Sequence, residues 1–185
     1  MIVKFQKEFL KELNAKYEYN GYTQILVGNR FYTATILIDS TPFIVCIPLH
    51  SNCRVNFISI EAPNSSSRWK NHGLDYGKLL LLKSYDLEKY ASIDAVKNNV
   101  WEDIMLKKDV VTSSVKQYFK DIINLLEKRE KQLLLSKQEK NNLDHSTLNC
   151  FPEYINELRE YNIDELEFTF KTFNSIWITK TYLTG

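Results

Sequence analysis

The sequence contains few of the residues that interrupt helices and strands, with five glycines and four prolines among 185 residues, and only three cysteines that could form disulfides. The scarcity of glycine and proline argues against a disordered or fibrous protein. Cys46, Cys53 and Cys150 cannot all pair with one another, and none lies in a CxxC motif, which favours a reducing compartment. No apolar run approaches the roughly 20 residues that cross a bilayer, and residues 1–8 lack the apolar centre of a signal peptide. We therefore expect a cytoplasmic protein.

Motifs that mark several large enzyme classes are also missing. The sequence has no Walker A motif and no GxGxxG, HExxH, GxSxG or paired CxxC pattern. Its three histidines, His50, His72 and His145, are far apart and lack the spacing of a metal site. These absences argue against a zinc or nucleotide enzyme, and we expect neither a metal nor another cofactor.

The residues that are present indicate a globular domain with uneven charge. The 11 tyrosines and 10 phenylalanines can build an aromatic core, and 185 residues suffice for one well-buried domain. We expect a single domain over 1–185, with a core region over 1–140 and a C-terminal extension over 141–185 whose helix and strand pack on the core. The net charge is +1, but residues 1–83 carry a balance of +4 and residues 145–185 one of −3. The first half is the better candidate to face a polyanion, although so small a surplus also arises by chance.

Hydrophobic periodicity predicts an α+β fold. Helices are predicted over residues 5–17, from Ser113 onward and over 151–159, and strands over 24–27, 30–38, 43–48, 55–60, 79–82, 166–170 and 176–178. Residues 141–149 have no apolar periodicity and are predicted to be a linker. The closely spaced strands indicate a compact, highly curved antiparallel sheet or small barrel flanked by helices.

Two of these predictions are strongest. The helix from Ser113 carries an apolar stripe at every third or fourth residue, formed by Val115, Phe119, Ile122 and Leu126. The strands over 30–38 and 43–48 are rich in β-branched and aromatic residues and flank Asp39-Ser40-Thr41-Pro42, which predicts a hairpin.

The most informative stretch, Ile47-Pro48-Leu49-His50-Ser51-Asn52-Cys53-Arg54, turns from apolar to polar at the end of this hairpin. Pro48 has no N–H for a sheet, so we expect it to mark the end of the strand. In a hairpin centred on Ser40, residue 30 lies opposite residue 50, so the Arg30 guanidinium is expected near His50 and Ser51.

One imidazole, one hydroxyl and two guanidiniums, with no metal ligands beside them, fit the chemistry of a phosphodiester. In metal-independent RNA cleavage the 2′-hydroxyl attacks phosphorus, so the protein must take one proton, give one and stabilise a dianionic transition state. Arg30 and Arg54 could stabilise charge, Ser51 could bind a phosphate oxygen and His50 could transfer the proton. The alternative is that His50 and Ser51 are ordinary loop residues.

A second cluster lies in residues 68–78, where aromatic and basic side chains alternate. Arg68, Trp69, Lys70, His72 and Tyr76 are candidates for a single-stranded RNA platform. Lys78 enters the strand over 79–82, so its ammonium is expected to be held in place. We therefore predict a catalytic set formed by Lys78 and the first cluster: His50, Ser51, Arg30 and Arg54. The alternative is a solvated loop in which Trp69 covers the core, and residues 128–140 are expected to form a solvated helix face.

At these positions the sequence resembles the toxins of type III toxin–antitoxin systems, the ToxN/AbiQ/CptN/TenpN group of endoribonucleases, and the TenpN branch in particular. The likeness rests on Arg30 opening a strand before Pro48-Leu49-His50-Ser51, on Arg54 after the serine, and on Gly73-Leu74-Asp75-Tyr76-Gly77-Lys78 entering an apolar strand. These motifs cover roughly residues 24–126. His50 stands where members often carry threonine, and Cys53 where a lysine is common.

The resemblance implies a fold like that of the MazF/Kid toxins and metal-independent cleavage that leaves a 2′,3′-cyclic phosphate. It also implies inhibition by a repeat RNA antitoxin, folded as a pseudoknot and processed by the toxin, and a role in plasmid maintenance and phage defence. The expected partners are this RNA and mRNA substrates in a hetero-oligomeric protein–RNA complex, without DNA or membrane.

Two other functions remain open from the residues alone. The basic first half could grip RNA without cutting it, which would make the protein a non-catalytic RNA-binding module. The helix over 113–135 could instead dock a protein partner.

Overall fold

The computed structural model describes residues 2–16, 31–50, 53, 55–60, 72–94 and 98–171. Within these ranges the strands are β1 (Ile2–Phe5), β2 (Phe31–Ile38), β3 (Phe43–His50), β4 (Phe57–Ser59), β5 (Gly73–Asp75), β6 (Leu80–Lys83), β7 (Ala91–Asp94) and β8 (Phe168–Lys171). The α-helices are α1 (Lys7–Lys16), α2 (Ser84–Tyr90), α3 (Asn98–Leu106), α4 (Lys108–Glu130), α5 (Lys137–Asp144) and α6 (Pro152–Leu158), and the 3₁₀ helices are η1 (Tyr76–Lys78) and η2 (Thr147–Cys150).

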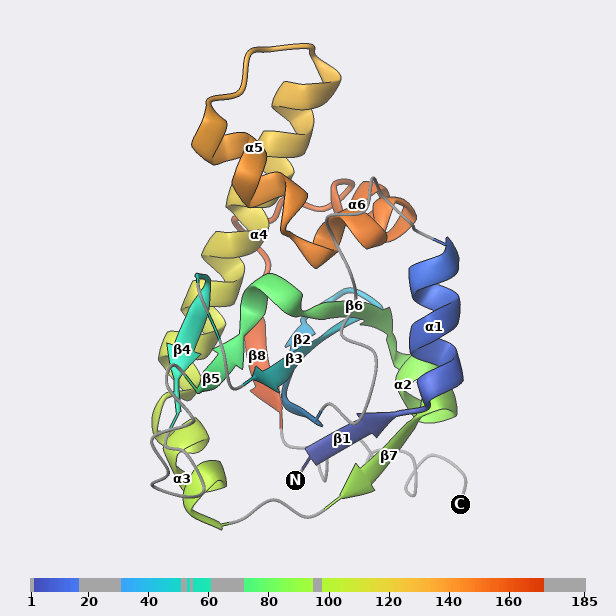
Figure 1. Cartoon of the computed structure of the whole chain (residues 1–185), viewed down its shortest axis with the longest axis vertical. Coiled ribbons are helices and arrows are strands. Elements are labelled where there is room, and N and C mark those ends of the chain that lie inside the picture. The colour runs from blue at the N-terminus through green and yellow to red at the C-terminus, as the bar shows by residue number, and fades with distance from the viewer. Residues whose placement is uncertain are drawn as a thin grey trace.

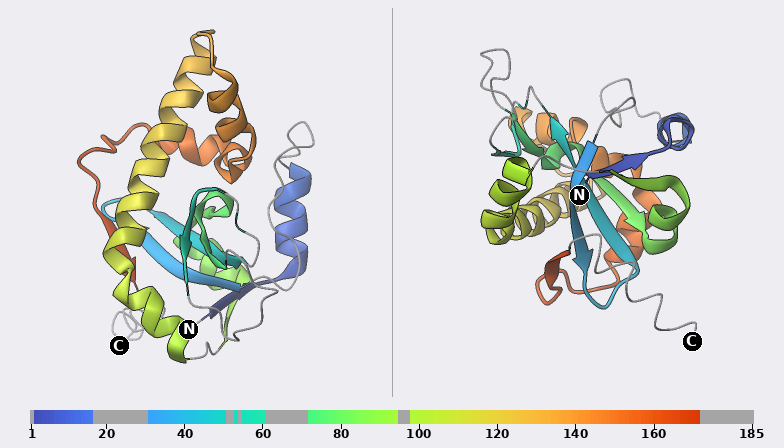
Figure 2. Two further views of the ribbon diagram at one scale, coloured as in Figure 1. Left: turned by 60° about the vertical axis from the view of Figure 1, so that its left-hand side comes forward. Right: turned by 90° about the horizontal axis from the view of Figure 1, so that it is seen from below.

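The described strands form one antiparallel sheet. Its order is β4-β5-β3-β2-β1-β7, with β6 also pairing with β3 and β8 with β2. The sheet curls strongly into a half-barrel, with α4 along one side and α1 on another (Figure 2). Helices α4 and α5 extend above it, as Figure 1 shows. The α+β class and the curved antiparallel sheet predicted from the sequence are therefore confirmed.

The β2–β3 hairpin forms as predicted. Its turn contains Ser40 with φ of 62°, and the Thr41 hydroxyl donates to the Ile38 carbonyl at 2.6 Å. The register runs from Leu37 opposite Ile44 to Phe31 opposite Leu49 and is shifted by one residue between Tyr32 and Ala34.

The prediction that Pro48 ends the strand is wrong, because β3 continues to His50. Pro48 pairs with Tyr32 at the irregular point of the β2–β3 ladder, where a residue without an N–H is tolerated. Beyond it, Leu49 and His50 pair with Leu74 and Gly73 of β5. His50 is consequently a strand residue with a fixed backbone, and not a loop residue.

The core lies between the curled sheet and the helices. Residues 43–47 of β3 and 79–82 around β6 are all buried, and their strands pair from Phe43–Lys83 to Cys46–Leu80. The four residues of the predicted stripe, Val115, Phe119, Ile122 and Leu126, are buried as expected. Phe119 makes an edge-on ring contact with Phe168 of β8, at 5.6 Å between centroids. This packing fixes α4 against the outer part of the sheet.

Several element boundaries differ from those predicted. Phe5 ends strand β1 instead of beginning a helix, and α4 begins at Lys108, five residues before Ser113. The predicted linker over 141–149 is wrong: α5 begins at a capping box of Ser136 and Glu139, and η2 follows it. The predicted strands over 24–27 and 176–178 lie outside the described residues.

No helix in the described part of the chain is long and apolar enough to cross a membrane. The three cysteines are free thiols and are buried.

Candidate catalytic pocket

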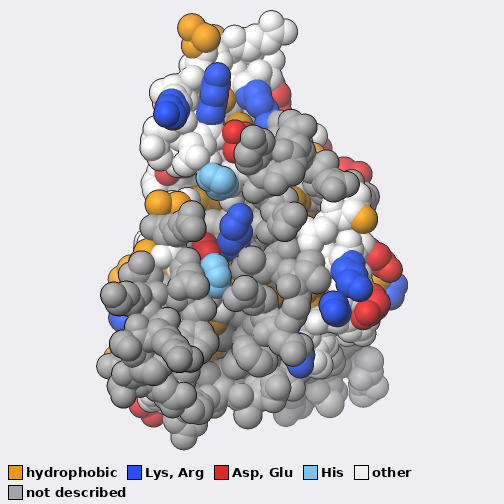
Figure 3. All heavy atoms as spheres, in the orientation of Figure 1, with side chains coloured by type: hydrophobic (Ala, Val, Ile, Leu, Met, Phe, Trp, Pro, Cys, Tyr) orange, Lys and Arg blue, Asp and Glu red, His pale blue; other side chains and the backbone are white. Residues whose placement is uncertain are grey.

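A pocket of about 270 Å³ opens where β3, β5 and η1 meet the segment that follows α5. It is lined by His50, Val55, Asn56, Asp75, Gly77, Lys78 and His145. On this face of the molecule, histidine, acidic and basic side chains gather among grey, undescribed atoms (Figure 3). The described lining therefore combines two imidazoles, one carboxyl and one ammonium, all of which can transfer protons or stabilise charge.

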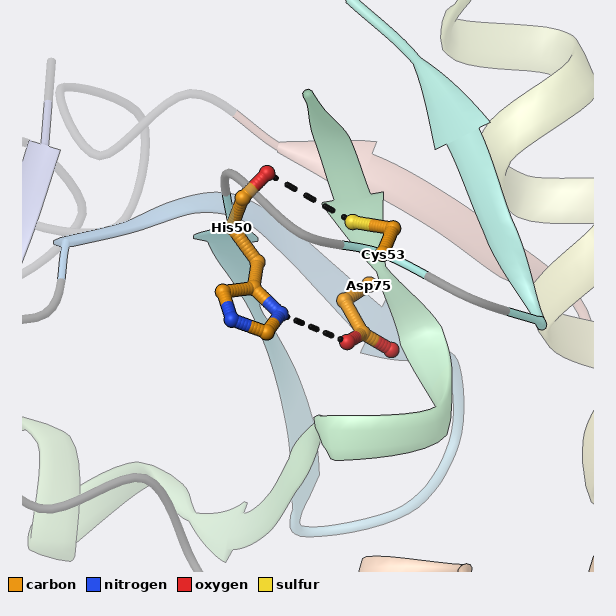
Figure 4. Close-up of side chains that lie close together, drawn as sticks. All are labelled: His50, Cys53 and Asp75. Atoms are coloured by element: carbon orange, nitrogen blue, oxygen red, sulfur yellow. Dashed lines mark hydrogen bonds and ion pairs between the residues drawn. The ribbon is translucent and has the colours of Figure 1, made fainter. Parts of the chain in front are cut away.

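The lining of the pocket includes a hydrogen-bonded imidazole and carboxyl from neighbouring strands. His50 Nδ1 lies 3.1 Å from Asp75 Oδ2. The His50 side chain is 19% exposed to solvent and that of Asp75 is 9% exposed. Asp75 lies at the end of β5, the strand that pairs with the end of β3. When Nδ1–H donates to the carboxylate, the second ring nitrogen, Nε2, is left to accept a proton. Figure 4 shows Nε2 pointing away from Asp75.

Burial sets the electrostatics of Asp75. It raises the pKa of the carboxyl above its ordinary value, and the neighbouring His50 and Lys78 lower this pKa by less. A buried carboxylate of this kind stabilises a cation beside it more strongly than an exposed one, because little water screens the interaction. The pair is thus suited to stabilise a protonated His50.

A tight backbone approach explains how Asp75 reaches His50. A side chain on Gly73 would place its Cβ 2.3 Å from the carbonyl oxygen of Ile58, so glycine lets β5 lie close to β4. Asn56, in the left-handed conformation with φ of 56°, accepts hydrogen bonds on its carbonyl from the N–H groups of Tyr76 and Gly77 at 2.9 and 3.2 Å. These contacts fix the turn from β5 into η1 and hence the position of Asp75.

Lys78 supplies a cation to the pocket. Its ammonium donates to the main-chain carbonyl of His145 at 3.2 Å. Burial lowers the pKa of Lys78 from its ordinary value, although Asp75 and Cys150 act in the opposite direction. The partly desolvated ammonium can stabilise a phosphate strongly because the local dielectric is low.

The segment around His145 is hydrogen-bonded to η1, to Leu79 and to α4. Thr147 donates through its hydroxyl to the carbonyls of Leu79 at 2.5 Å and Gly77 at 3.3 Å. The Tyr118 hydroxyl donates to Ser146 Oγ at 2.5 Å, and both groups are buried. The contact between Thr147 and Gly77, 70 positions apart in the chain, therefore holds His145 near Gly77 and Lys78, which also line the pocket.

Cys53 lies behind the His50–Asp75 pair. Its thiol donates weakly to the carbonyl of His50 at 3.5 Å (Figure 4) and to that of Gly73 at 3.7 Å. Burial, with the Asp75 charge, raises the pKa of the thiol to about 12. The ligand atoms of His50, Cys53 and Asp75 lie within 4.8 Å of one another, so these three residues could hold a metal ion. Such an ion would have to replace the His50–Asp75 hydrogen bond.

The structure brings together two of the five predicted catalytic residues, His50 and Lys78. The other three, and three of the predicted RNA-binding residues, lie outside the described residues: Arg30, Ser51, Arg54, Arg68, Trp69 and Lys70. His72 is buried, with Nδ1 facing the Ile60 carbonyl at 3.2 Å. Tyr76 is half-buried and packs edge-on against Tyr118 at 5.5 Å. The described contacts of these last two residues are with the protein interior.

The sequence analysis did not single out Asp75 and His145, which line the pocket. Asp75 lies inside the quoted motif 73–78, and an acidic residue at the end of an otherwise apolar strand was a usable signal. His145 carried no such signal, because it is 95 positions from His50 and lies in a segment without periodicity.

No protein-family model matches the chain, and neither a search of curated proteins nor one of solved structures returns a match.

Proposed function

We propose that the protein is a metal-independent endoribonuclease that cleaves RNA by attack of the 2′-hydroxyl on the adjacent phosphorus. The observation that carries this proposal is the His50–Asp75 pair, held at 3.1 Å in a pocket that also contains Lys78. A base oriented by a carboxylate and a nearby cation are the groups that transesterification of a phosphodiester requires.

In the proposed reaction, His50 Nε2 takes the proton of the 2′-hydroxyl while the O2′–P bond forms. Asp75 stabilises the resulting imidazolium through Nδ1–H, as a buried carboxylate does beside a catalytic histidine. Lys78 stabilises the negative charge on the non-bridging oxygens. The P–O5′ bond breaks, O5′ receives a proton, and the products carry a 2′,3′-cyclic phosphate and a 5′-hydroxyl.

We propose further that this enzyme is the toxin of a type III toxin–antitoxin system, with a fold like that of MazF/Kid. Support for this part comes from the motifs at Arg30, 48–54 and 73–78. Under this proposal a repeat RNA, processed by the toxin, occupies the pocket and blocks it, and mRNA is the substrate that is cut when the RNA is lost.

The test is incubation of purified protein with RNA in the presence of EDTA, followed by analysis of the new ends. We expect 2′,3′-cyclic phosphate ends from the parent and a loss of about 10²–10⁴-fold in rate for His50→Gln. Lys108→Met, at the exposed start of α4, is the control and should cut at the parental rate. Intact RNA with tight binding would instead support the non-catalytic RNA-binding module.

The toxin assignment has a separate test in growing cells. Expression of the parent should stop growth, whereas Arg30→Ala and Ser51→Ala proteins should be tolerated. Equal toxicity of parent and variants would contradict the roles given to Arg30 and Ser51.

A further inference from the structure

The proposed reaction needs a second proton-transfer group, because the leaving O5′ must be protonated while His50 is taking a proton. The pocket contains one other imidazole, that of His145, among its described lining residues. Figure 3 shows histidine side chains on either side of a lysine or arginine side chain on this face. In an in-line displacement, two imidazoles could serve as the base and the acid, and a cation between them could stabilise the charge on the phosphate.

We propose that His145 is the general acid that delivers the proton to O5′, and thus a catalytic residue of the same site. This inference rests on the proposed endoribonuclease function. In the cleavage step His145 loses a proton to O5′ as the P–O5′ bond breaks, and His50 gains one from the 2′-hydroxyl. Proton exchange with water then restores both imidazoles for the next turnover.

The contacts of the two imidazoles differ in the way these roles require. His50 has Nδ1 engaged by Asp75, so its other ring nitrogen, Nε2, is the one left to take the proton of the 2′-hydroxyl. The His145 side chain is exposed, and in the part of the chain that the structure describes its ring has no hydrogen-bond partner. An imidazole whose ring nitrogens have no protein partner can donate directly to a leaving oxygen.

His145 is nevertheless held in place through its backbone. Its N–H donates to the Asn141 carbonyl at 3.1 Å and its carbonyl accepts from Lys78 at 3.2 Å. The next two residues bind Tyr118 and the carbonyls of Gly77 and Leu79. Because all these contacts avoid the imidazole, His145→Ala should remove the acid while Lys78 keeps its partner.

A pair of substrates tests the role directly. A dinucleotide with its natural 5′-oxygen needs a proton on the leaving group, whereas one with sulfur in place of O5′ releases a thiolate that needs none. We expect His145→Ala to lose about 10²–10⁴-fold in kcat on the natural dinucleotide. On the 5′-thio dinucleotide it should fall within about tenfold of the parent, because no acid is required. His50→Ala should lose activity on both.

The control is Lys140→Ala, an exposed position on α5 that does not line the pocket and should match the parent on both dinucleotides. The assignment would be overturned if His145→Ala kept the parental kcat on the natural substrate. It would also be overturned if this variant unfolded at the parental denaturant concentration and yet lost activity equally on both substrates. If the parent cuts neither RNA nor either dinucleotide, it is the proposed function itself that fails.

Discussion

The imidazole of His50 and the carboxyl of Asp75 lie 3.1 Å apart, although the two residues are 25 positions apart in the chain. Their backbones are neighbours because His50 pairs with Gly73, two residues before Asp75. The pair is therefore fixed by strand register and not by flexible side chains, which is the rigidity that a catalytic dyad needs.

Replacing Asp75 with asparagine tests whether the charge of this side chain matters or only the space that it fills. The asparagine side chain would fill the same space but carry no charge to stabilise the imidazolium, so we expect kcat to fall by up to about 10⁴-fold with little change in KM. Single-turnover cleavage of RNA measures this. An Asp75→Asn enzyme with parental kcat would show that Asp75 serves packing only.

The pH dependence of stability provides a control for the same variant. Because burial raises the pKa of Asp75, the folded chain holds this proton more tightly than the unfolded chain. Stability from this group is present at low pH and is lost as pH rises through the folded pKa. Denaturant unfolding should find Asp75→Asn at least as stable as the parent near about pH 7, with the difference shrinking toward about pH 4. If Asp75→Asn instead became less stable than the parent as the pH approached neutrality, burial would not be the cause of the raised pKa.

Lys78 should be needed for its charge. Lys78→Met keeps most of the apolar stem but loses the ammonium, and we expect a loss of about 10²–10³-fold in kcat because the phosphate charge is no longer stabilised. Lys78→Arg, which keeps the charge, should retain more activity than Lys78→Met. If both variants and Lys108→Met lose activity equally, the effect is not specific to this pocket.

Gly73 and Gly77 form a matched pair for testing the turn. Alanine at Gly73 would meet the Ile58 carbonyl at 2.3 Å, whereas at Gly77 its nearest neighbour is Asp75 Oδ1 at 3.3 Å. We expect Gly73→Ala to lower the free energy of unfolding by about 1–3 kcal/mol and to reduce activity, because β4 and β5 must move apart. Gly77→Ala should cost less. Equal unfolding midpoints for the two variants would contradict this account.

The three thiols should be unreactive while the chain is folded. Burial raises the pKa of Cys46 and Cys53 to about 12 and that of Cys150 to about 11, so almost no thiolate is present at neutral pH. A chromogenic disulfide reagent should label none of them in the native protein and all three in denaturant. Rapid native labelling would show that at least one thiol is accessible.

Local patterns made part of this fold predictable. The β2–β3 hairpin and the buried stripe of α4 follow from alternation and from a 3.6-residue period within short stretches. Strand β5 has three residues and β1 has four, so both are too short to show a periodic signal. The pairing of β1 with β7 joins residues about 90 positions apart, which no local pattern reveals. These short segments become strands because they pair with the rest of the sheet, and not because of their own sequence pattern.

The site was predictable to the same extent. His50 and Lys78 stood out because polar residues flanked apolar strands. Their assembly with Asp75 and His145 depends on long-range contacts, namely the β3–β5 pairing and the clamp from Thr147 to Gly77 and Leu79. Spacing along the chain carries no information about either contact.

The most direct test of the central claim is a double-mutant cycle on His50 and Asp75, read as the rate at which 2′,3′-cyclic phosphate ends form in EDTA. If the two residues act as one unit, His50→Gln combined with Asp75→Asn should be no slower than His50→Gln alone, because the carboxylate has no imidazolium left to stabilise. A double variant whose loss equals the product of the two single losses would contradict the account.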